Sequence, residues 1–382
     1  MSEARPRPAD ASGACIACLR RGWLLAELGA MLDCNTRADG RLLDVLALGD
    51  RQLIAALGGR RRAELLRRHA GFASERRSTA DSLQAVCRHD DRYPPRAREL
   101  DGVAALHVLG GVERLRQLTA QPVVAFVGRA RASDYGIALA SSIGRGLAAA
   151  GVTVASGLLG GVGPAALGGA LELGAPAVAV VGGGVDVGAP ARQQALHRRL
   201  SRSGCAVGEL PCGSPARRWT ALAAERLLVA FADVALFVES EQSANALVGA
   251  RVAAALGRTV AAVPGRVTSR GSRGPHALLR EGARLVTGPG DLLDLLGDGE
   301  RPSPALDERG SPRAWEGLDP FLRAVLERVG SGEDTPGRLL GARDDARALL
   351  CALGELELMG LLVRGEGARY LVGDPLAAPS PR

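Results

Sequence analysis

Short apolar runs alternate with longer amphipathic segments through the middle of the chain. The first run covers residues 123–127 (Val-Val-Ala-Phe-Val), and Ser133 then precedes a helical pattern as a typical N-cap. This alternation indicates parallel strands covered by helices on both faces. It predicts a Rossmann-like, doubly wound α/β domain over residues 91–296. Further strands fit residues 152–155, 177–181, 206–208, 234–238, 260–263 and 285–286, and helices fit 133–150, 164–173, 190–200, 217–229, 244–256 and 289–296.

Helical periodicity dominates the first part of the chain. Leu24, Leu25, Leu28 and Leu32 follow a helical spacing, so residues 1–90 predict a small helical domain of the SAM or helix-hairpin kind. Arginines at 60–62, 67 and 68 mark a basic helix, which is either a solvated face or a contact to phosphate backbones.

The last part of the chain is compact again after a polar interruption. Residues 297–314 are rich in Pro, Gly, Ser and charge and predict a linker. Residues 315–382 contain three helical patterns and a hairpin, which suggests a winged-helix-like domain. The segment from Gly297 onward carries 11 Arg against 15 Asp and Glu, a net of −4. We therefore expect a protein-contact or self-association module rather than a reader of duplex DNA.

Composition and charge narrow the function classes. The chain has 382 residues, 47% hydrophobic and 23% charged, which are values of a globular protein. It lacks lysine, so all 48 Lys and Arg positions are arginine. This composition reflects either a coding bias or the use of arginine in contacts to phosphate. The net charge of +7 divides into +11 before Gly297 and −4 after it, so the first part could bind a polyanion. Apolar runs stay too short for a membrane span, and seven scattered cysteines fit a reducing cytoplasm.

Glycine-rich loops follow several predicted strands. Gly128, Ser156-Gly157, Gly160-Gly161 and Gly182-Gly183-Gly184 would meet at the carboxyl edge of the sheet. They predict a phosphate-binding rim, although tight turns of α/β folds need glycines as well. Neither G-x-G-x-x-G at its required spacing nor a Walker A sequence is present, which argues against a dinucleotide or P-loop site.

The sequence indicates no catalytic set. The five histidines show no paired metal-ligand spacing, and G-x-S-x-G is missing. Cys15 and Cys18 form one C-x-x-C without a second pair, and Cys87 stands alone, so we interpret the motif as a helix start with buried thiols. We expect no metal, no cofactor and no enzymatic activity. Acids near strand ends are interpreted as loop or cap ligands: Asp186, Glu209 and Glu239.

The middle domain resembles the DprA/Smf family, the DNA-processing proteins of bacterial transformation. The resemblance covers residues 90–375, and Tyr-Pro-Pro at 93–95 lies ahead of the first predicted strand as in the family. The matching stretches include Ala-Ser-Asp-Tyr-Gly at 132–136 and Gly-Val-Thr-Val-Ala-Ser-Gly-Leu at 151–158. Others are at 127–128, 169–172, 184–187, 209–211, 263–265, 272–274 with His276, and 280–283.

The resemblance implies binding of single-stranded DNA and help in loading a RecA-type recombinase onto it. It also implies a cytoplasmic homodimer with no membrane association. Carried onto this chain, the nucleic-acid-binding residues would be Gly128, Arg129, Arg131, Ser133, Ser156, Gly157, Arg192, Arg226, Arg251, Arg273 and His276.

Departures from the family pattern keep two alternatives open. The family's Gly-Ser-Arg is Gly-Arg-Ala at 128–130, its Phe-Pro-x-Arg-Asn-Arg is Ala-Leu-Ala-Ala-Glu-Arg at 221–226, and its Ser-Gly-Ser-Leu-Ile-Thr is Ala-Asn-Ala-Leu-Val-Gly at 244–249. One alternative is a degenerate paralogue that acts through protein contacts. The other is a nucleotide-processing enzyme similar in fold to the cytokinin-activating phosphoribohydrolases, although their Pro-Gly-Gly-x-Gly-Thr run is absent.

Overall fold

The computed structural model describes residues 13–35, 42–72, 83–187, 193–243, 247–297, 318–330, 333, 335–340, 345–365 and 369–372. Two units are separated between Gly297 and Asp298. The linker predicted at residues 297–314 lies almost entirely outside the described residues. Arg192 lies outside them as well.

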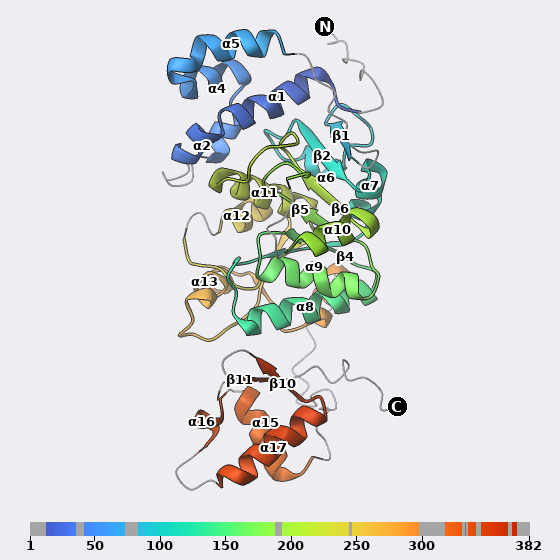
Figure 1. The fold of residues 1–382 in the computed structure, drawn as a ribbon, viewed down its shortest axis with the longest axis vertical. Helices are drawn as coiled ribbons and strands as arrows, with labels where there is room; N and C mark the ends of the chain where they lie inside the picture. Colours follow the sequence, from blue (N-terminus) through green and yellow to red (C-terminus); the bar gives the residue numbers. More distant parts are fainter. Residues whose placement is uncertain are drawn as a thin grey trace. The chain divides into compact units, whose positions relative to one another are not determined.

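One large sheet organises the first unit (Figure 1). Among the described residues it has nine strands in the order β1-β2-β6-β5-β4-β3-β7-β8-β9. The strands from β6 to β9 in this order pair in parallel, and β1 and β2 add an antiparallel edge. The strands are β1 (Leu83–Cys87), β2 (Ala105–Leu109), β3 (Val123–Val127), β4 (Thr153–Gly157), β5 (Ala177–Val180), β6 (Cys205–Gly208), β7 (Val234–Phe237), β8 (Thr259–Ala262) and β9 (Arg284–Leu285).

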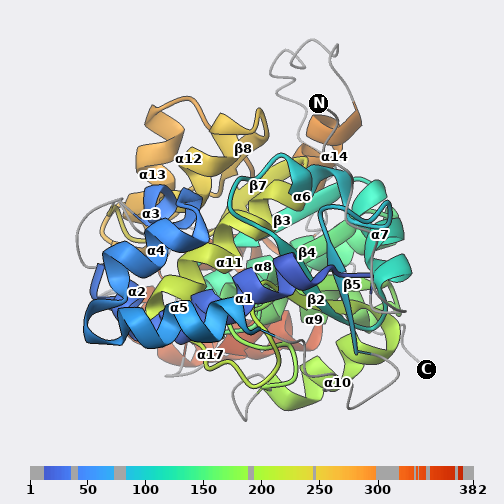
Figure 2. The ribbon, with the colours of Figure 1, turned by 90° about the horizontal axis from the view of Figure 1, so that it is seen from above.

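Alternation along the central strands builds two cores. Val124 and Phe126 of β3 point into one cluster, and Ala125 points into the other, because successive side chains leave opposite faces of a sheet. Helices pack on both faces of the sheet to complete these clusters. α12 and α13 lie towards β8 (Figure 2), and α10 contacts β6. The helices of this region are α6 (Pro95–Arg98), α7 (Val112–Ala120), α8 (Asp134–Ala149), α9 (Val162–Glu172), α10 (Gln194–Ser203), α11 (Arg218–Phe231), α12 (Val248–Ala255), α13 (Arg273–Arg280) and α14 (Pro289–Gly297).

The predicted α/β class is confirmed, with strands within about two residues of those expected. Ser133 is the N-cap of α8, and its Oγ accepts a hydrogen bond from Gly136 N at 3.2 Å. Strands β1 and β2 were not predicted. Residues 83–87 (Leu-Gln-Ala-Val-Cys) were assigned to a helical domain, and their strand conformation depends on antiparallel pairing with β2.

The N-terminal helices pack against the α/β unit rather than standing apart from it. Leu24, Leu28 and Leu53 share a buried cluster with Leu210 and with Trp219 of α11. Figure 1 shows these helices in blue, together at one end of the first unit. Their bounds are α1 (Ile16–Glu27), α2 (Gly29–Asn35), α3 (Leu42–Ala47), α4 (Asp50–Leu57) and α5 (Arg62–Ala70).

The basic helix α5 is partly neutralised within the chain. Arg61 and Arg68 each place a guanidinium nitrogen 2.8 Å from a carboxylate oxygen of Glu27. Arg61 belongs to the turn before α5 and Arg68 to α5 itself, so this basic segment offers less positive charge to phosphate than its sequence suggests.

The second unit has its own small core. Leu326 and Val329 of α15 (Pro320–Gly330) pack against Leu353 of α17 (Ala346–Leu358). A third helix, α16 (Pro336–Leu339), and an antiparallel hairpin of β10 (Leu362–Gly365) and β11 (Arg369–Val372) complete the described part. The content of helices and hairpin agrees with the prediction, and the winged-helix assignment itself stays a prediction. Within the described ranges, no helix combines the length and the apolar character needed to cross a bilayer.

Glycines allow α8 and α9 to pack with their backbones close together. A Cβ atom on Gly144 of α8 would lie 2.3 Å from the carbonyl oxygen of Ala166 in α9. A Cβ atom on Gly169 of α9 would lie 2.2 Å from the carbonyl oxygen of Ser141. Gly168, one residue earlier, has open space at the same position. The contact therefore excludes a side chain at 144 and 169 but not at 168.

Gly144 and Gly168 predict opposite effects of substitution by alanine. Gly144→Ala should lower the free energy of unfolding by about 1–3 kcal/mol, because the added methyl group forces the two helix backbones apart. Gly168→Ala should raise it by about 0.5–1 kcal/mol, because alanine restricts the unfolded chain and meets no obstacle. Urea denaturation followed by circular dichroism measures both. Equal effects of the two substitutions would show that the helices do not pack in this way.

Candidate nucleic-acid interface

The sheet changes winding direction between β3 and β7, and loops from both strands meet at that point. β4 follows β3 on one side and β8 follows β7 on the other, which is the topological switch where open α/β sheets bind ligands. The loop at 128–133 leaves β3 there, and Glu239 follows β7 on the opposite side.

The buried Glu239 carboxylate holds the first loop in place. Its Oε2 accepts a hydrogen bond from Ser133 N at 2.9 Å, and its Oε1 accepts one from the Ser133 hydroxyl at 2.5 Å. The backbone N of Arg129 donates to the carbonyl oxygen of Glu239 at 2.9 Å. Glu239 is therefore a loop ligand, as the sequence indicated, and it fixes the backbone that carries Arg129 and Arg131.

Exposed arginines lie on the loops of this edge. Arg131 is exposed, and Arg129 is one-third exposed with its Nη2 3.6 Å from Glu241 Oε1. A Cβ atom on Gly271 would lie 3.4 Å from Arg129 Nη1, so this guanidinium reaches the turn before α13. Arg273, the first residue of α13, is also exposed. Arg129 and the start of α13 are thus neighbours, which brings separate parts of the sequence to one basic edge.

A cavity of about 440 Å³ opens beside this edge, at the carboxyl ends of β3, β4 and β5. Its lining is mostly glycine and aliphatic side chains, such as Leu158, Leu159 and Val187. Two of its lining residues can carry charge, His197 and Glu225. His197 is oriented by the backbone, since its Nε2 lies 3.1 Å from the carbonyl oxygen of Val185.

Glu225 places an acid in this apolar cavity. Its Oε1 accepts a hydrogen bond from Gly249 N at 2.9 Å, and burial raises the pKa of the carboxyl to about 7. The Glu225 carboxyl therefore changes between its neutral and its ionised form near neutral pH, and the charge of the cavity changes with it. In the sequence this residue stood out only as part of a departure from the DprA/Smf pattern at 221–226. The feature of the sequence that could have pointed to Glu225 is an acid within an otherwise apolar helical segment at 221–225.

The glycine loops serve close packing as well as lining the cavity. A Cβ atom on Gly161, which has φ of +63°, would lie 2.0 Å from the carbonyl oxygen of Arg129. On Gly182 and Gly183 it would lie 2.8 and 2.9 Å from the backbone oxygens of Thr220 and Ser214. These glycines let neighbouring segments pack with their backbones close together. Close packing was the other reason for glycine at these positions, beside a phosphate-binding rim.

Two residues expected at the interface have polar groups committed inside the fold. Arg226 is buried, with Nη2 2.7 Å from Glu209 Oε2 and Nη1 donating to the carbonyl oxygen of Asp101 at 2.8 Å. Ser156 is buried too, and its hydroxyl donates to the carbonyl oxygen of Phe126 at 2.6 Å. Arg226 therefore does not lie on the rim as expected, because it satisfies polar groups inside the fold. Ser156 does line the cavity, but its hydroxyl is committed to the Phe126 carbonyl.

The remaining expected residues divide between this edge and other places. Gly128 and Gly157 line the cavity. His276 lies near the edge, with its Nε2 3.0 Å from the carbonyl oxygen of Gly265. Arg251 lines a separate groove between α12 and α13, and its role in DNA binding stays a prediction.

Comparisons with known proteins identify a family that this chain matches. The family model described as DNA recombination-mediator protein A matches residues 84–297. A protein of Mycobacterium tuberculosis named as a DNA processing protein DprA is 34% identical over 305 residues, covering 72% of this chain and 78% of its own.

Two solved structures share the fold. DNA processing protein A from Streptococcus pneumoniae has a TM-score of 0.57 and 25% identity, covering 73% of this chain and 96% of its own. DNA processing protein A from Helicobacter pylori, described with a single-stranded DNA binding mode, has a TM-score of 0.50 and 21% identity, covering 56% of this chain and 95% of its own.

The raised pKa of Glu225 predicts a pH-dependent stability. Between the ordinary value of 4.5 and about 7, the folded protein holds this proton more tightly than the unfolded chain. Stability of the native protein should therefore fall as pH rises through that window, by up to about 3 kcal/mol relative to Glu225→Gln, which cannot ionise. Urea denaturation of both proteins from pH 4.5 to 8 measures the difference. Parallel profiles would show that the carboxyl is well solvated.

Proposed function

Because the chain belongs to the DNA recombination-mediator protein A family, we propose that it binds single-stranded DNA at the edge formed by Arg129, Arg131 and Arg273. The observation that carries the proposal is the Glu239-held loop, which presents two arginines at the switch point of the sheet. Loading of a RecA-type recombinase onto that DNA, assembly as a homodimer and a cytoplasmic location are further parts of the proposal.

Charge supports a polyanion as the ligand. Residues before Gly297 carry a net charge of +11, and Arg131 and Arg273 are exposed. Arginine contacts phosphate without regard to base sequence, so this edge would bind many DNA sequences with similar affinity. Glu241 offsets part of the charge on Arg129, and phosphate would compete with it for the guanidinium.

The apolar cavity supports a single strand rather than a duplex. Bases of a single strand can leave the stack and lie against apolar or aromatic surfaces, whereas a duplex keeps them inside. Leu158 and Leu159 line the cavity next to the arginine loop. Tyr135 follows Arg131 by four residues at the start of α8. Its side chain is 47% exposed and offers an aromatic face. Binding alone performs this function, and the proposal includes no chemical step on the DNA.

Glu225 and the glycine packing favour a second candidate, a family member that acts through protein contacts. An acid in the cavity opposes phosphate when ionised, and Arg226 beside it is committed to Glu209. This candidate predicts oligonucleotide binding no tighter than that of an inert protein, even at low salt. A salt titration of binding to an unstructured oligonucleotide therefore separates the two candidates.

Removing the two loop arginines tests the proposed edge. Replacing Arg129 and Arg131 together by Ala should weaken binding of all unstructured oligonucleotides to a similar degree. It should also flatten the slope of log K against log salt by about 0.7 for each lost phosphate contact. Fluorescence anisotropy at several salt concentrations measures both quantities.

Arg116→Ala is the matched control, because this exposed arginine of α7 pairs with Glu113 and lies outside the cavity lining. An unchanged slope in the double variant, with the fold intact by circular dichroism, would contradict the proposed role of the loop.

The second unit predicts a small effect on DNA binding. From Gly297 onward the net charge is −4, and the hairpin residue Arg364 places its Nε 3.1 Å from Glu357 Oε2. Phosphate would on balance be repelled by this part of the chain. Deleting residues 298–382 should leave oligonucleotide affinity within a few-fold, as measured by the same anisotropy assay. A collapse of affinity in a folded truncated protein would assign DNA contacts to the second unit.

A further inference from the structure

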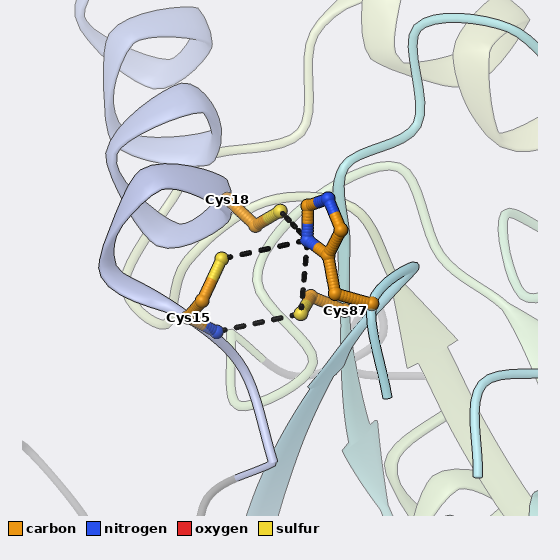
Figure 3. Close-up of side chains that lie close together, drawn as sticks. Cys15, Cys18 and Cys87 are labelled. Atoms are coloured by element: carbon orange, nitrogen blue, oxygen red, sulfur yellow. Dashed lines mark hydrogen bonds between the residues drawn. The ribbon is translucent and has the colours of Figure 1, made fainter. Parts of the chain in front are cut away.

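Three cysteines and a histidine from two distant segments converge beside the sheet. Cys15 precedes α1 and Cys18 lies in its first turn, whereas Cys87 ends β1 and His89 follows in the next turn. Their ligand atoms all lie within 4.8 Å of one another (Figure 3). The sequence was interpreted as one C-x-x-C without a second pair. Folding brings Cys87 and His89 beside this C-x-x-C, a grouping that the sequence did not indicate.

The distances in this cluster centre on one nitrogen. His89 Nδ1 lies 3.6 Å from Cys15 Sγ, 3.4 Å from Cys18 Sγ and 3.8 Å from Cys87 Sγ. A ring nitrogen has either one hydrogen or one lone pair, so hydrogen bonding to three thiols at once leaves most of these contacts unexplained.

A tetrahedral metal ion accounts for all three contacts. Zinc bonds of about 2.3 Å to sulfur and about 2.0–2.1 Å to nitrogen place tetrahedral sulfur and nitrogen ligands about 3.6 Å apart. The three observed distances lie on both sides of that value. The four ligand atoms also lie too close together to surround a cluster of several irons.

We propose that Cys15, Cys18, Cys87 and His89 bind one zinc ion. Three thiolates and an imidazole form a ligand set that zinc prefers, and four protein ligands close the coordination sphere. The site is therefore structural rather than catalytic. The backbone N of Cys15 lies 3.4 Å from Cys87 Sγ and donates to it, which would stabilise the thiolate as an outer-shell partner.

The alternative of a helix cap with buried thiols explains less. Cys15 occupies the N-cap position of α1, but its side chain makes no capping hydrogen bond to the helix. Burial of Cys15, Cys18 and Cys87 agrees with either interpretation. Only the zinc interpretation gives His89 a reason to face all three sulfurs.

The position of the site suggests what the ion does. It would connect the start of α1 to the end of β1, across 72 residues of sequence between Cys15 and Cys87. The apolar cluster there is small, with Ala14 and Ala105 as its other buried members. Metal bonds would therefore attach the N-terminal helices to the sheet where hydrophobic burial is limited.

Metal analysis of the full-length chain tests the proposal. Protein purified without chelator should contain one zinc per chain by plasma mass spectrometry. Cys18→Ser and His89→Ala should lose most of it, whereas His89→Cys should retain it, because cysteine restores a fourth ligand. Cys34→Ser and Cys351→Ser are matched controls at exposed cysteines and should keep the full content.

Measurements on the native chain decide the matter even if a variant fails to fold. Mercurial titration of its thiols should release zinc stoichiometrically, and cobalt substitution should give a thiolate charge-transfer band with the strong visible absorption of tetrahedral cobalt. Removing the ion with a chelator should lower the melting temperature.

Three outcomes would overturn the proposal. One is less than about a tenth of an equivalent of zinc after reconstitution in zinc-containing buffer. Another is cobalt binding without the thiolate band. The third is a disulfide between two of the three cysteines in protein isolated under reducing, air-free conditions.

Discussion

Burial of the parallel sheet on both faces is the constraint on which the rest of this structure depends. Strands β3, β4, β5 and β7 are buried almost throughout, so their side chains are committed to two cores. Aromatic residues make up only 3% of the chain, and small side chains fill those cores instead. Small side chains require helices to approach closely, as α8 and α9 do through Gly144 and Gly169. A ligand can then be met only at strand ends and loops.

At the carboxyl edge, one buried acid organises the loops that carry positive charge. Glu239 uses its carboxylate on Ser133 and its backbone carbonyl on Arg129, so the loop after β3 depends on a residue after β7. A nearby acid, Glu225, lies in the cavity with its pKa raised. The edge thus combines exposed arginines with an apolar, weakly acidic cavity. This combination would favour a strand with phosphates outside and unstacked bases against the protein.

The N-terminal helices are attached to this unit in two different ways. Leu24, Leu53 and Trp219 share an apolar cluster on α11, which is ordinary hydrophobic packing. At the other attachment the buried side chains are alanines and cysteines, and little apolar area is available. The proposed zinc site lies at that second place. It would add strength where burial alone contributes least, and it lies apart from the proposed DNA-binding edge at the loops after β3 and β7.

Local pattern in the sequence was sufficient for the α/β class, for most strand positions and for the N-cap at Ser133, because these depend on residues close together along the chain. It also indicated Arg129 and Arg131 through their place after an apolar strand. The burial of Arg226 and the internal hydrogen bond of Ser156 could not be predicted, because the sequence does not show whether an arginine or a serine meets a buried partner or solvent. Strand β1 and the Cys15, Cys18, Cys87 and His89 cluster were decided only by tertiary structure. Each requires two segments far apart in sequence to be brought to one edge of the sheet, and pairing of that kind leaves no local periodicity to detect.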